Sequence, residues 1–360
     1  MPYLRRLFRF NALTGFRCLA ACMVFIYHNR KYWREQLHPE ITRLFNEFHL
    51  GVELFFVLSG FLIAYTYGEK PAHSAKNYTR YMLQRMARIL PLYWLILTVY
   101  YLDAPYVKEP VSWRTYSLVH GFSDVYNLDG ISQAWSLTVE MTFYFLAPLL
   151  CLLQRKHLLY LLGFLVFLFG AAWAVGAIWH QANGNPGKYF YPLEFIITSS
   201  FPGHSTQFLA GMLLAGELRN KEGTWLNKIP YKTLVGFLGM LLTMYGIGLF
   251  QQNIFEHGYQ HTGGKLLQLF VLPVFVFFAL AGLIGEQTML QRFFGSRLLV
   301  LLGNASFAFY LIHISYVNRK MMSWFLLPDR NFIALWLVAI VLYLAFEKPV
   351  YDRCRKWLKR

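Results

Sequence analysis

Residues 158–179 read LLYLLGFLVFLFGAAWAVGAIW, a stretch of 22 residues without an acidic or basic charge. An α-helix needs about 20 consecutive apolar residues to cross the hydrocarbon core of a bilayer. Lipid offers the backbone no hydrogen-bond partners, so a segment inside it satisfies its N–H and C=O groups within a helix. This stretch therefore predicts a transmembrane helix.

The rest of the 360-residue chain has the same character. Hydrophobic residues make up 56% of the chain and charged residues 14%, and the mean hydropathy is +0.36. Soluble domains carry about 25% charged residues, and the alternating pattern of a membrane β-barrel is absent. The sequence therefore predicts an all-α integral membrane protein.

About ten transmembrane helices are expected, because several apolar runs approach the length that spans a bilayer. Their ranges are 12–29, 50–67, 89–103, 136–153, 158–179, 203–218, 232–250, 266–284, 298–316 and 331–347. No internal repeat can be aligned, so residues 1–360 are predicted to form a single membrane domain without a fused extracytoplasmic domain. The N-terminus resembles a signal peptide, but Arg17 interrupts its apolar run, so a retained helix is expected.

The basic residues follow the topology of these helices. Lys and Arg number 34 against 18 Asp and Glu, a formal net charge of +16. Loops on the side of both termini carry 22 Lys and Arg, loops on the other side carry 11, and Arg17 lies inside the first helix. Basic loops stay in the cytoplasm. We therefore predict a multi-pass protein of a bacterial inner membrane with both termini cytoplasmic, and we expect no nucleic-acid partner.

Arg17 and His28 are ionisable residues in the first apolar run, where such groups are costly and therefore candidates for function. Eleven positions separate them, which places them on one face of a helix, about 16 Å apart along its axis. An Arg is a fixed cation suited to phosphate or carboxylate, and a His can take up and return a proton near neutral pH. The alternative is an inward Arg held by backbone carbonyls and an interfacial His.

Two carboxylates lie at the outer ends of predicted helices. Glu53 is at a depth where it can meet His28 and fix the tautomer of its ring; the alternative is an interfacial Glu that faces water. Glu140 shares a helix face with Ser136 and follows Trp135. An aromatic platform beside a hydrogen-bond acceptor is typical of a sugar-binding site, and a structural polar pair is the alternative.

Two further groups of polar residues are candidates. Arg85 and Arg88 are placed at the cytoplasmic mouth of the third helix, where they can clamp a phosphorylated donor such as coenzyme A; a solvated basic cluster is the alternative. Ser306, Tyr310 and His313 are spaced so that they form one stripe along the ninth helix, where they can form a polar site. The alternative is that this stripe only packs against other helices. The His and Cys residues show no ligand spacing, so no metal is expected.

At this point the sequence resembles the acyltransferase-3 family of membrane-bound O-acyltransferases. The matching motifs are Arg17-x10-His28, the stretch from Gly51 to Ile63 around Glu53, Arg85-Met-Ala-Arg88, Trp135-Ser-Leu-Thr-Val-Glu140, Ser306-x3-Tyr310-Leu-Ile-His313 and Glu347-Lys-Pro349. The family often has Asp where this chain has Glu53. The residues before Phe208 also depart from its pattern, so no site is carried over there.

The resemblance implies ten core helices, an acyl-coenzyme A donor bound from the cytoplasm, and an acceptor hydroxyl on an extracytoplasmic glycan or glycolipid. It implies that His28 is essential, as general base or as transient acyl carrier, and it strengthens the roles of Arg17, Arg85, Arg88 and Glu140. Acetyl-coenzyme A is then a co-substrate, and membrane lipid is the surrounding partner. No permanently bound cofactor is expected.

The expected mechanism assigns separate residues to donor binding, to the chemical step and to acceptor binding. Arg17, Arg85 and Arg88 bind the donor, and His28, Glu53 and Glu140 carry the chemistry. The acceptor is held by Trp135, Ser136, Tyr310 and His313. Two alternatives stay open: transfer of succinyl or another acyl group by the same mechanism, and a polytopic transporter, although carriers often show two related halves and none is visible here.

Overall fold

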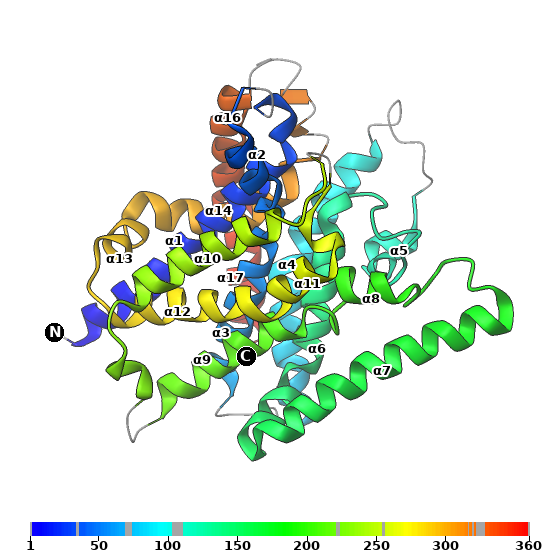
Figure 1. The fold of residues 1–360 in the computed structure, drawn as a ribbon, viewed down its shortest axis with the longest axis horizontal. Coiled ribbons are helices and arrows are strands. Elements are labelled where there is room, and N and C mark those ends of the chain that lie inside the picture. Colours follow the sequence, from blue (N-terminus) through cyan, green and yellow to red (C-terminus); the bar gives the residue numbers. More distant parts are fainter. Residues whose placement is uncertain are drawn as a thin grey trace. The chain divides into compact units, whose positions relative to one another are not determined.

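The computed structural model describes residues 2–33, 36–68, 74–102, 111–220, 224–253, 256–315, 317–318, 320–321 and 328–358. Throughout these ranges the regular elements are helices and no strand occurs; one isolated bridge joins Ser123 to Tyr189. Figure 1 shows this all-helical fold. The prediction of an all-α protein is confirmed for the described part of the chain.

Every predicted helix range overlaps a helix of the described residues; positions 103 and 316, at the ends of two ranges, lie outside those residues. The long helices are α1 (Pro2–His28), α3 (Gly51–Tyr67), α4 (Ala75–Leu102), α6 (Trp135–Lys156), α7 (Leu158–Asn183), α9 (Ser205–Arg219), α10 (Lys232–Gly248), α12 (Leu272–Gly285), α14 (Arg297–Ile312), α16 (Pro328–Leu342) and α17 (Lys348–Trp357). Short helices are α2 (Pro39–Asn46), α5 (Trp113–Tyr116), α8 (Leu193–Ser199), α11 (Thr262–Leu266) and α13 (Met289–Phe294). Two π-helical segments, η7 (Leu267–Val271) and η8 (Tyr343–Glu347), continue directly into α12 and α17.

Within the described residues, six helical stretches are long and apolar enough to cross a membrane. They are Phe10–Tyr32, Pro39–Tyr67, Ser132–Lys156, Leu158–Asn183, Thr262–Gly285 and Arg330–Trp357. Lys232–Gly248 and Arg297–Ile312 are shorter apolar helices. The chain is thus a multi-pass membrane protein by the length and composition of its helices, whereas the total of ten spans and the cytoplasmic location of the termini stay predictions.

Two of the differences between predicted and observed helix boundaries affect predicted site residues. α4 begins at Ala75, so the arginine cluster lies within this helix and not in a loop before it. α14 ends at Ile312, so His313 is not on the helix that carries Tyr310. The cause of the second difference is local, because the N–H and hydroxyl of Ser315 both donate to the Ile312 carbonyl and close the helix with a turn.

Contacts between residues divide the chain into two compact units. The first comprises Met1–Tyr65, Thr206–Tyr310 and Pro328–Phe332, and the second comprises Thr66–Ser205, Leu311–Leu327 and Ile333–Arg360. Each unit is therefore assembled from segments far apart in the sequence. The interpretation as a single domain stays a prediction.

Glycines allow close helix packing in the first unit. α10 and α12 run side by side (Figure 1), with Gly236 against the backbone of Ala279 and Gly282 against that of Thr233. α3 and α9 meet in the same way: a Cβ on Gly60 would lie 2.2 Å from the Phe208 carbonyl oxygen, and one on Gly211 would lie 2.0 Å from that of Val57. Membrane helices associate through such small residues, because the lipid supplies no hydrophobic driving force between them.

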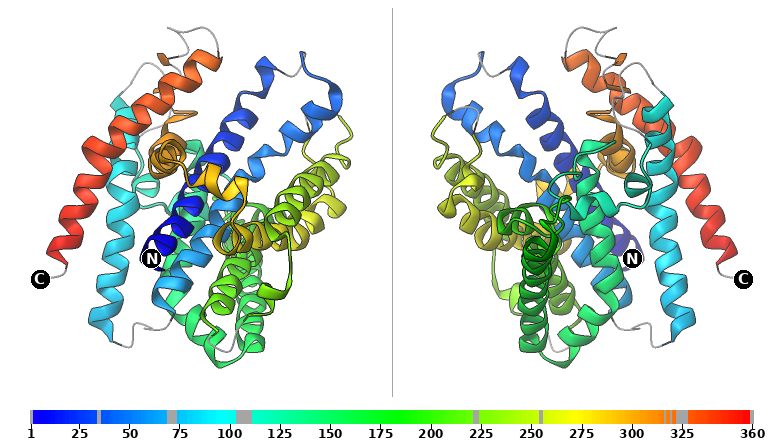
Figure 2. Two further views of the ribbon diagram at one scale, coloured as in Figure 1. Left: turned by 90° about the vertical axis from the view of Figure 1, so that its left-hand side faces the viewer. Right: turned by 90° about the vertical axis from the view of Figure 1, so that its right-hand side faces the viewer.

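The second unit is built on α4 and α6. α4 packs along α17, as Figure 2 shows for the cyan and red helices. α7 continues from α6 and buries only Leu161, Leu165 and Gly176 among its 26 residues. Most of this apolar helix therefore faces outward, as expected of a helix that contacts lipid.

We predict that Gly211→Val destabilises the protein by about 1–3 kcal/mol, because a side chain at this position collides with the backbone of α3. The check is the unfolding midpoint of the purified protein in detergent. Gly170→Val is the matched control, because nothing lies within 4 Å of a Cβ at Gly170. Equal midpoints for the two variants would contradict the close approach of α3 and α9.

Candidate functional site

α1 carries the first two predicted site residues on one unbroken helix. Arg17 and His28 are both partly exposed, and the helix places them about 16 Å apart along its axis. The Arg17 guanidinium carbon lies 6.0 Å from the ring centroid of Phe55. The ring of Tyr310, another predicted site residue, lies 6.1 Å from the same Phe55 ring. Phe55 is thus a shared neighbour of Arg17 and Tyr310.

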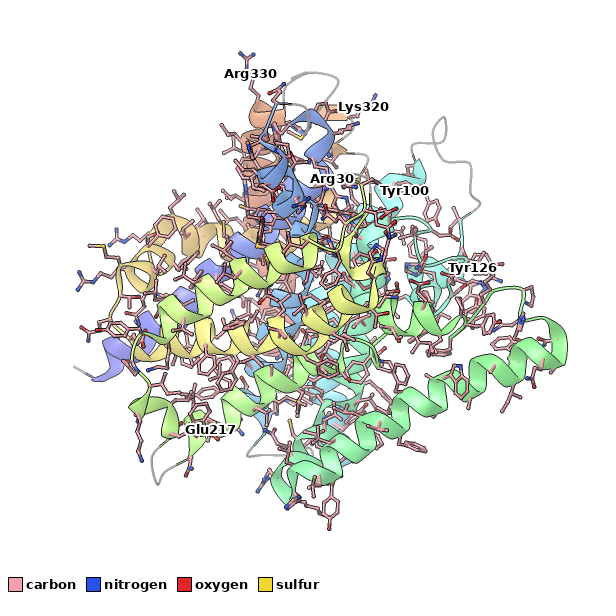
Figure 3. The ribbon with its side chains drawn as sticks, viewed as in Figure 1. Arg30, Tyr100, Tyr126, Glu217, Lys320 and Arg330 are labelled. Atoms are coloured by element: carbon pink, nitrogen blue, oxygen red, sulfur yellow. The ribbon has the colours of Figure 1, made fainter. Side chains whose placement is uncertain are left out.

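An aromatic collar surrounds the end of α1. The Tyr27 ring lies 4.7 Å from the ring of His28, and the Tyr27 hydroxyl is 3.1 Å from Nε2 of His257. The guanidinium of Arg30, labelled in Figure 3, lies 4.2 Å from the Tyr27 ring. The ring of His49 lies 5.2 Å from the Tyr27 ring. Periodicity gave no sign of this collar, because Arg30, His49 and His257 lie outside the long helices and are distant from one another in sequence.

A buried carboxylate fixes the collar in place. Glu47 is fully buried and accepts hydrogen bonds from the Gly258 N–H at 2.7 Å and the Gln251 amide at 2.6 Å. These bonds tie the loop before α3 to the loop before α11. In that second loop, outside the membrane-spanning segments, burial and the nearby His49 lower the pKa of His257 to about 4, so its ring is neutral at pH 7.

Glu53 is held by a residue that the sequence analysis did not select. Glu53 is 3% exposed, and its Oε1 accepts a hydrogen bond of 2.7 Å from the side-chain amide of Gln268. Gln268 lies in the π-helical segment η7, which begins directly after α11 ends at Leu266. The predicted pairing of Glu53 with His28 stays a prediction.

Arg85 lies in a cage of tyrosines. Its Nη2 donates to the Tyr67 hydroxyl at 3.0 Å, and its guanidinium lies 5.3 Å from the ring of Tyr67, 5.9 Å from that of Tyr81 and 5.8 Å from that of Tyr144. Its Nε is buried without a hydrogen bond, and no carboxylate of the described residues forms an ion pair with it. Arg85 is therefore a cation held by rings and a hydroxyl.

Arg88 has a different environment, although it is only three residues away. Its Nη1 lies 2.7 Å from Oε1 of Glu347, whose side chain is 2% exposed, and its guanidinium is 5.8 Å from the ring of Tyr351. Glu347 is the last residue of η8. Arg88 thus joins α4 to the C-terminal helix by a largely buried ion pair, and an incoming anion would compete with Glu347 for it.

The Trp135 motif is connected to Arg85 through one of the cage tyrosines. The Tyr144 hydroxyl donates to Oε1 of Glu140 at 2.5 Å, while the Tyr144 ring faces the Arg85 guanidinium. Trp135 lies 5.6 Å from the ring of His204. Two predicted site residues from separate motifs, Arg85 and Glu140, are therefore brought together by a tyrosine one turn after Glu140.

The remaining predicted residues are held near the start of α6 and the end of α14. Ser136 donates to the Gln133 carbonyl at 2.9 Å, and the Gln133 amide donates to the Leu311 carbonyl at 2.9 Å. The backbone carbonyl of His313 accepts from the Asn318 amide. Ser136 and His313 thus lie on segments that Gln133 links by way of Leu311.

The segment after α4 is tied to the one after α7. Ser123 bridges Tyr189, and the Phe190 N–H donates to the Phe122 carbonyl at 3.0 Å. Tyr126, labelled in Figure 3, lies under the guanidinium of Arg114 at 4.7 Å. Burial lowers the pKa of His120 in this segment to about 4.

Across the described ranges no group of three His, Cys, Asp or Glu residues is arranged to hold a metal.

Comparison with known proteins gives this geometry its context. The profile of the acyltransferase domain named Acyl_transf_3 matches residues 10–346. "Putative O-acetyltransferase SACOL0978" of Staphylococcus aureus strain COL is 22% identical over 330 residues, which cover 85% of this chain and 50% of that protein. "Acyltransferase MdmB" of Streptomyces mycarofaciens is 25% identical over 346 residues, 88% of this chain and 82% of that protein.

The chain spans about half the length of the Staphylococcus relatives it matches. No solved structure matches it. The family profile, by contrast, extends from α1, which carries Arg17 and His28, to residue 346 in η8. This chain therefore belongs to the acyltransferase-3 family.

Proposed function

We propose that the protein is a bacterial inner-membrane O-acyltransferase that moves an acyl group, acetyl in the first instance, from acyl-coenzyme A to a hydroxyl of an envelope polysaccharide or glycolipid. Family membership and the name of the Staphylococcus relatives support acyl transfer. The observation that carries the proposal from the chain itself is the environment of Arg85, which suits the phosphorylated donor of such a reaction.

A guanidinium in a partly buried cage favours an anionic ligand. Removing a charge from water is costly unless an opposite charge or hydrogen bonds compensate for it. Around Arg85 the described residues supply tyrosine rings and one hydroxyl but no carboxylate. A phosphate of coenzyme A can accept paired hydrogen bonds from a guanidinium. We therefore assign the phosphate contact to Arg85 before Arg88, which Glu347 already neutralises.

The transfer itself is assigned to His28. Its neutral imidazole accepts the proton of the acceptor hydroxyl as the oxygen attacks the thioester carbonyl. The carbon–oxygen bond forms, the carbon–sulfur bond breaks, and the proton leaves with the thiolate as free coenzyme A. In the alternative route the acyl group rests on His28 before it passes to the hydroxyl. Both routes need the donor thioester to reach the end of α1.

Arg17 fits donor binding better than bond making. It lies about 16 Å from His28 along α1, which is too far for both side chains to contact one reacting carbonyl. An extended pantetheine arm spans a distance of this order. We therefore place Arg17 along the path of the donor and His28 at the end of that path.

Glu53 and the Trp135 motif complete the proposed site. Glu53 orients His28, and Gln268 holds Glu53 by a charge-assisted hydrogen bond. Trp135, Ser136 and Glu140 hold the acceptor sugar together with Tyr310 and His313, which flank the end of α14. Tyr144 links Glu140 to the donor cage, because its hydroxyl donates to Glu140 and its ring faces the Arg85 guanidinium.

His28→Ala is expected to reduce glycan-stimulated coenzyme A release by at least about 100-fold, the usual contribution of a positioned general base. Release is measured from acetyl-coenzyme A with purified protein in nanodiscs, with and without envelope glycan extract. Mass spectrometry of the glycan product distinguishes acetyl from succinyl transfer. His157→Ala is the control, because His157 is an exposed cap of α7. Full activity of His28→Ala would refute the proposed mechanism.

Arg85→Gln is expected to raise the KM for acetyl-coenzyme A about tenfold or more, because it removes the charge offered to the donor phosphates. Arg88→Gln is expected to raise this KM less, because Glu347 already occupies Arg88. The comparison uses initial rates at saturating acceptor, with the unfolding midpoint recorded for each variant. A larger effect at Arg88 than at Arg85 would reverse the assignment of the phosphate site.

Gln268→Leu is expected to lower kcat by about tenfold while the KM for acetyl-coenzyme A changes little, because it removes a hydrogen bond from Glu53 and not a donor contact. Gln291→Leu is the control, since Gln291 bonds the Leu283 carbonyl and no predicted site residue. An unchanged kcat, or a loss confined to the donor KM, would show that Gln268 does not act through Glu53.

A further inference from the structure

A groove runs between α4 and α17 in the second unit. Six apolar residues of α4, from Leu83 to Trp94, form one of its walls, and Cys354, Trp357 and Leu358 of α17 form the other. Its volume is about 200 Å³, and its lining is apolar. Figure 2 shows the two helices beside each other. None of the residues assigned to acyl transfer lines this groove.

The dimensions of the groove suit a hydrocarbon chain. The α4 wall runs from Leu83 to Trp94, eleven residue steps or about 16 Å at the rise of an α-helix. One leaflet of a bilayer has a hydrocarbon depth of about 15 Å, half of the usual core. Trp94 is 42% exposed and Trp357 is 71% exposed, so the described residues leave parts of two large rings at the groove uncovered. An acyl chain lying in the groove would cover them.

The charge beside the groove selects the kind of lipid. Lys348, Arg353, Arg355 and Lys356 of α17 are all exposed, and Asp352 is the one acidic residue of that helix. Arg80 is exposed on α4 and lies three residues before Leu83, on the same helix face as the groove. Basic residues next to a membrane attract anionic headgroups. The C-terminal end is also on the predicted cytoplasmic side, where anionic lipids are found.

We propose that this groove binds an anionic phospholipid, with one acyl chain along α4 and the phosphate among Arg80 and the basic residues of α17. Such a lipid would hold α17 against α4 and thereby support the Arg88–Glu347 pair, which joins the same two parts of the unit. The proposal does not depend on acyl transfer, because binding is measured without donor or acceptor.

The test uses delipidated full-length protein in detergent. Phosphatidylglycerol or phosphatidylcholine with the same dibrominated acyl chains is added, and bromine quenching of tryptophan fluorescence is measured. The portion of the quenching that is lost in the Trp357→Phe variant reports on lipid in the groove. We expect saturable quenching at a concentration of phosphatidylglycerol at least fivefold lower than that of phosphatidylcholine. We also expect phosphatidylglycerol alone to raise the unfolding midpoint.

Two sets of variants test separately the contribution of the apolar groove and that of the basic residues beside it. Ala87→Phe and Cys354→Phe each fill the groove from one wall and should abolish the preferential quenching, so failure of one to fold leaves the other as a test. Val166→Phe, at a 72% exposed position of α7, should keep it. Changing Arg353, Arg355 and Lys356 together to Gln should remove the preference for phosphatidylglycerol, whereas the same change at exposed Lys228, Arg292 and Arg297 should not.

Three outcomes would overturn the proposal. Equal quenching by both lipids would mean ordinary lipid contact without selection of the headgroup. Unchanged phosphatidylglycerol binding in both groove-filling variants would place the lipid elsewhere. Displacement of the brominated lipid by palmitoyl-coenzyme A, but not by unlabelled phosphatidylglycerol, would mean that the groove holds the acyl chain of a donor.

Discussion

Charged side chains within a membrane domain need compensation, because lipid provides neither water nor counterions. This protein meets the requirement in three ways. Arg88 is neutralised by Glu347, Glu53 accepts a hydrogen bond from the Gln268 amide, and Arg85 is surrounded by tyrosine rings. Arg88 and Glu53 thus have polar partners within the protein. Arg85, by contrast, is a cation that forms no ion pair with an acidic residue of the described chain. The proposed donor site follows from that difference.

The two π-helical segments explain how the compensating groups reach their partners. η7 supplies Gln268 and η8 supplies Glu347, and each segment ends two residues before a proline, Pro273 and Pro349. Proline has no N–H for the carbonyl four residues earlier, so the α-helical ladder is interrupted there. A widened turn accommodates this interruption and redirects the side chains next to it. The Glu347-Lys-Pro349 motif thus combines the ionic partner of Arg88 with the proline beside which the turn is widened.

The helical class and the helix positions could be predicted from the sequence, because long apolar runs have few alternatives to a helix in lipid. The start of α4 could not, since the segment 75–88 contains four Lys and Arg residues and is too polar to be recognised as part of a membrane helix. In the structure this segment is helical, and Tyr81 and Arg85 have partners on other elements. The motifs identified Arg85, Glu53 and Glu140, but the contacts of Arg85 with Tyr67 and Tyr144 and the bond from Gln268 to Glu53 depend on the packing of different elements. Spacing along one helix indicates only the Glu140–Tyr144 bond, whose residues lie four positions apart on α6.

Tyr144 shows why a motif is not yet a site. Its ring faces the Arg85 guanidinium, and its hydroxyl donates to Glu140, so it touches residues of two motifs without belonging to either. An anion bound at Arg85 would draw the guanidinium away from the ring, and the ring carries the hydroxyl that Glu140 accepts. Occupancy of the proposed donor cage would in this way alter the carboxylate assigned to the acceptor.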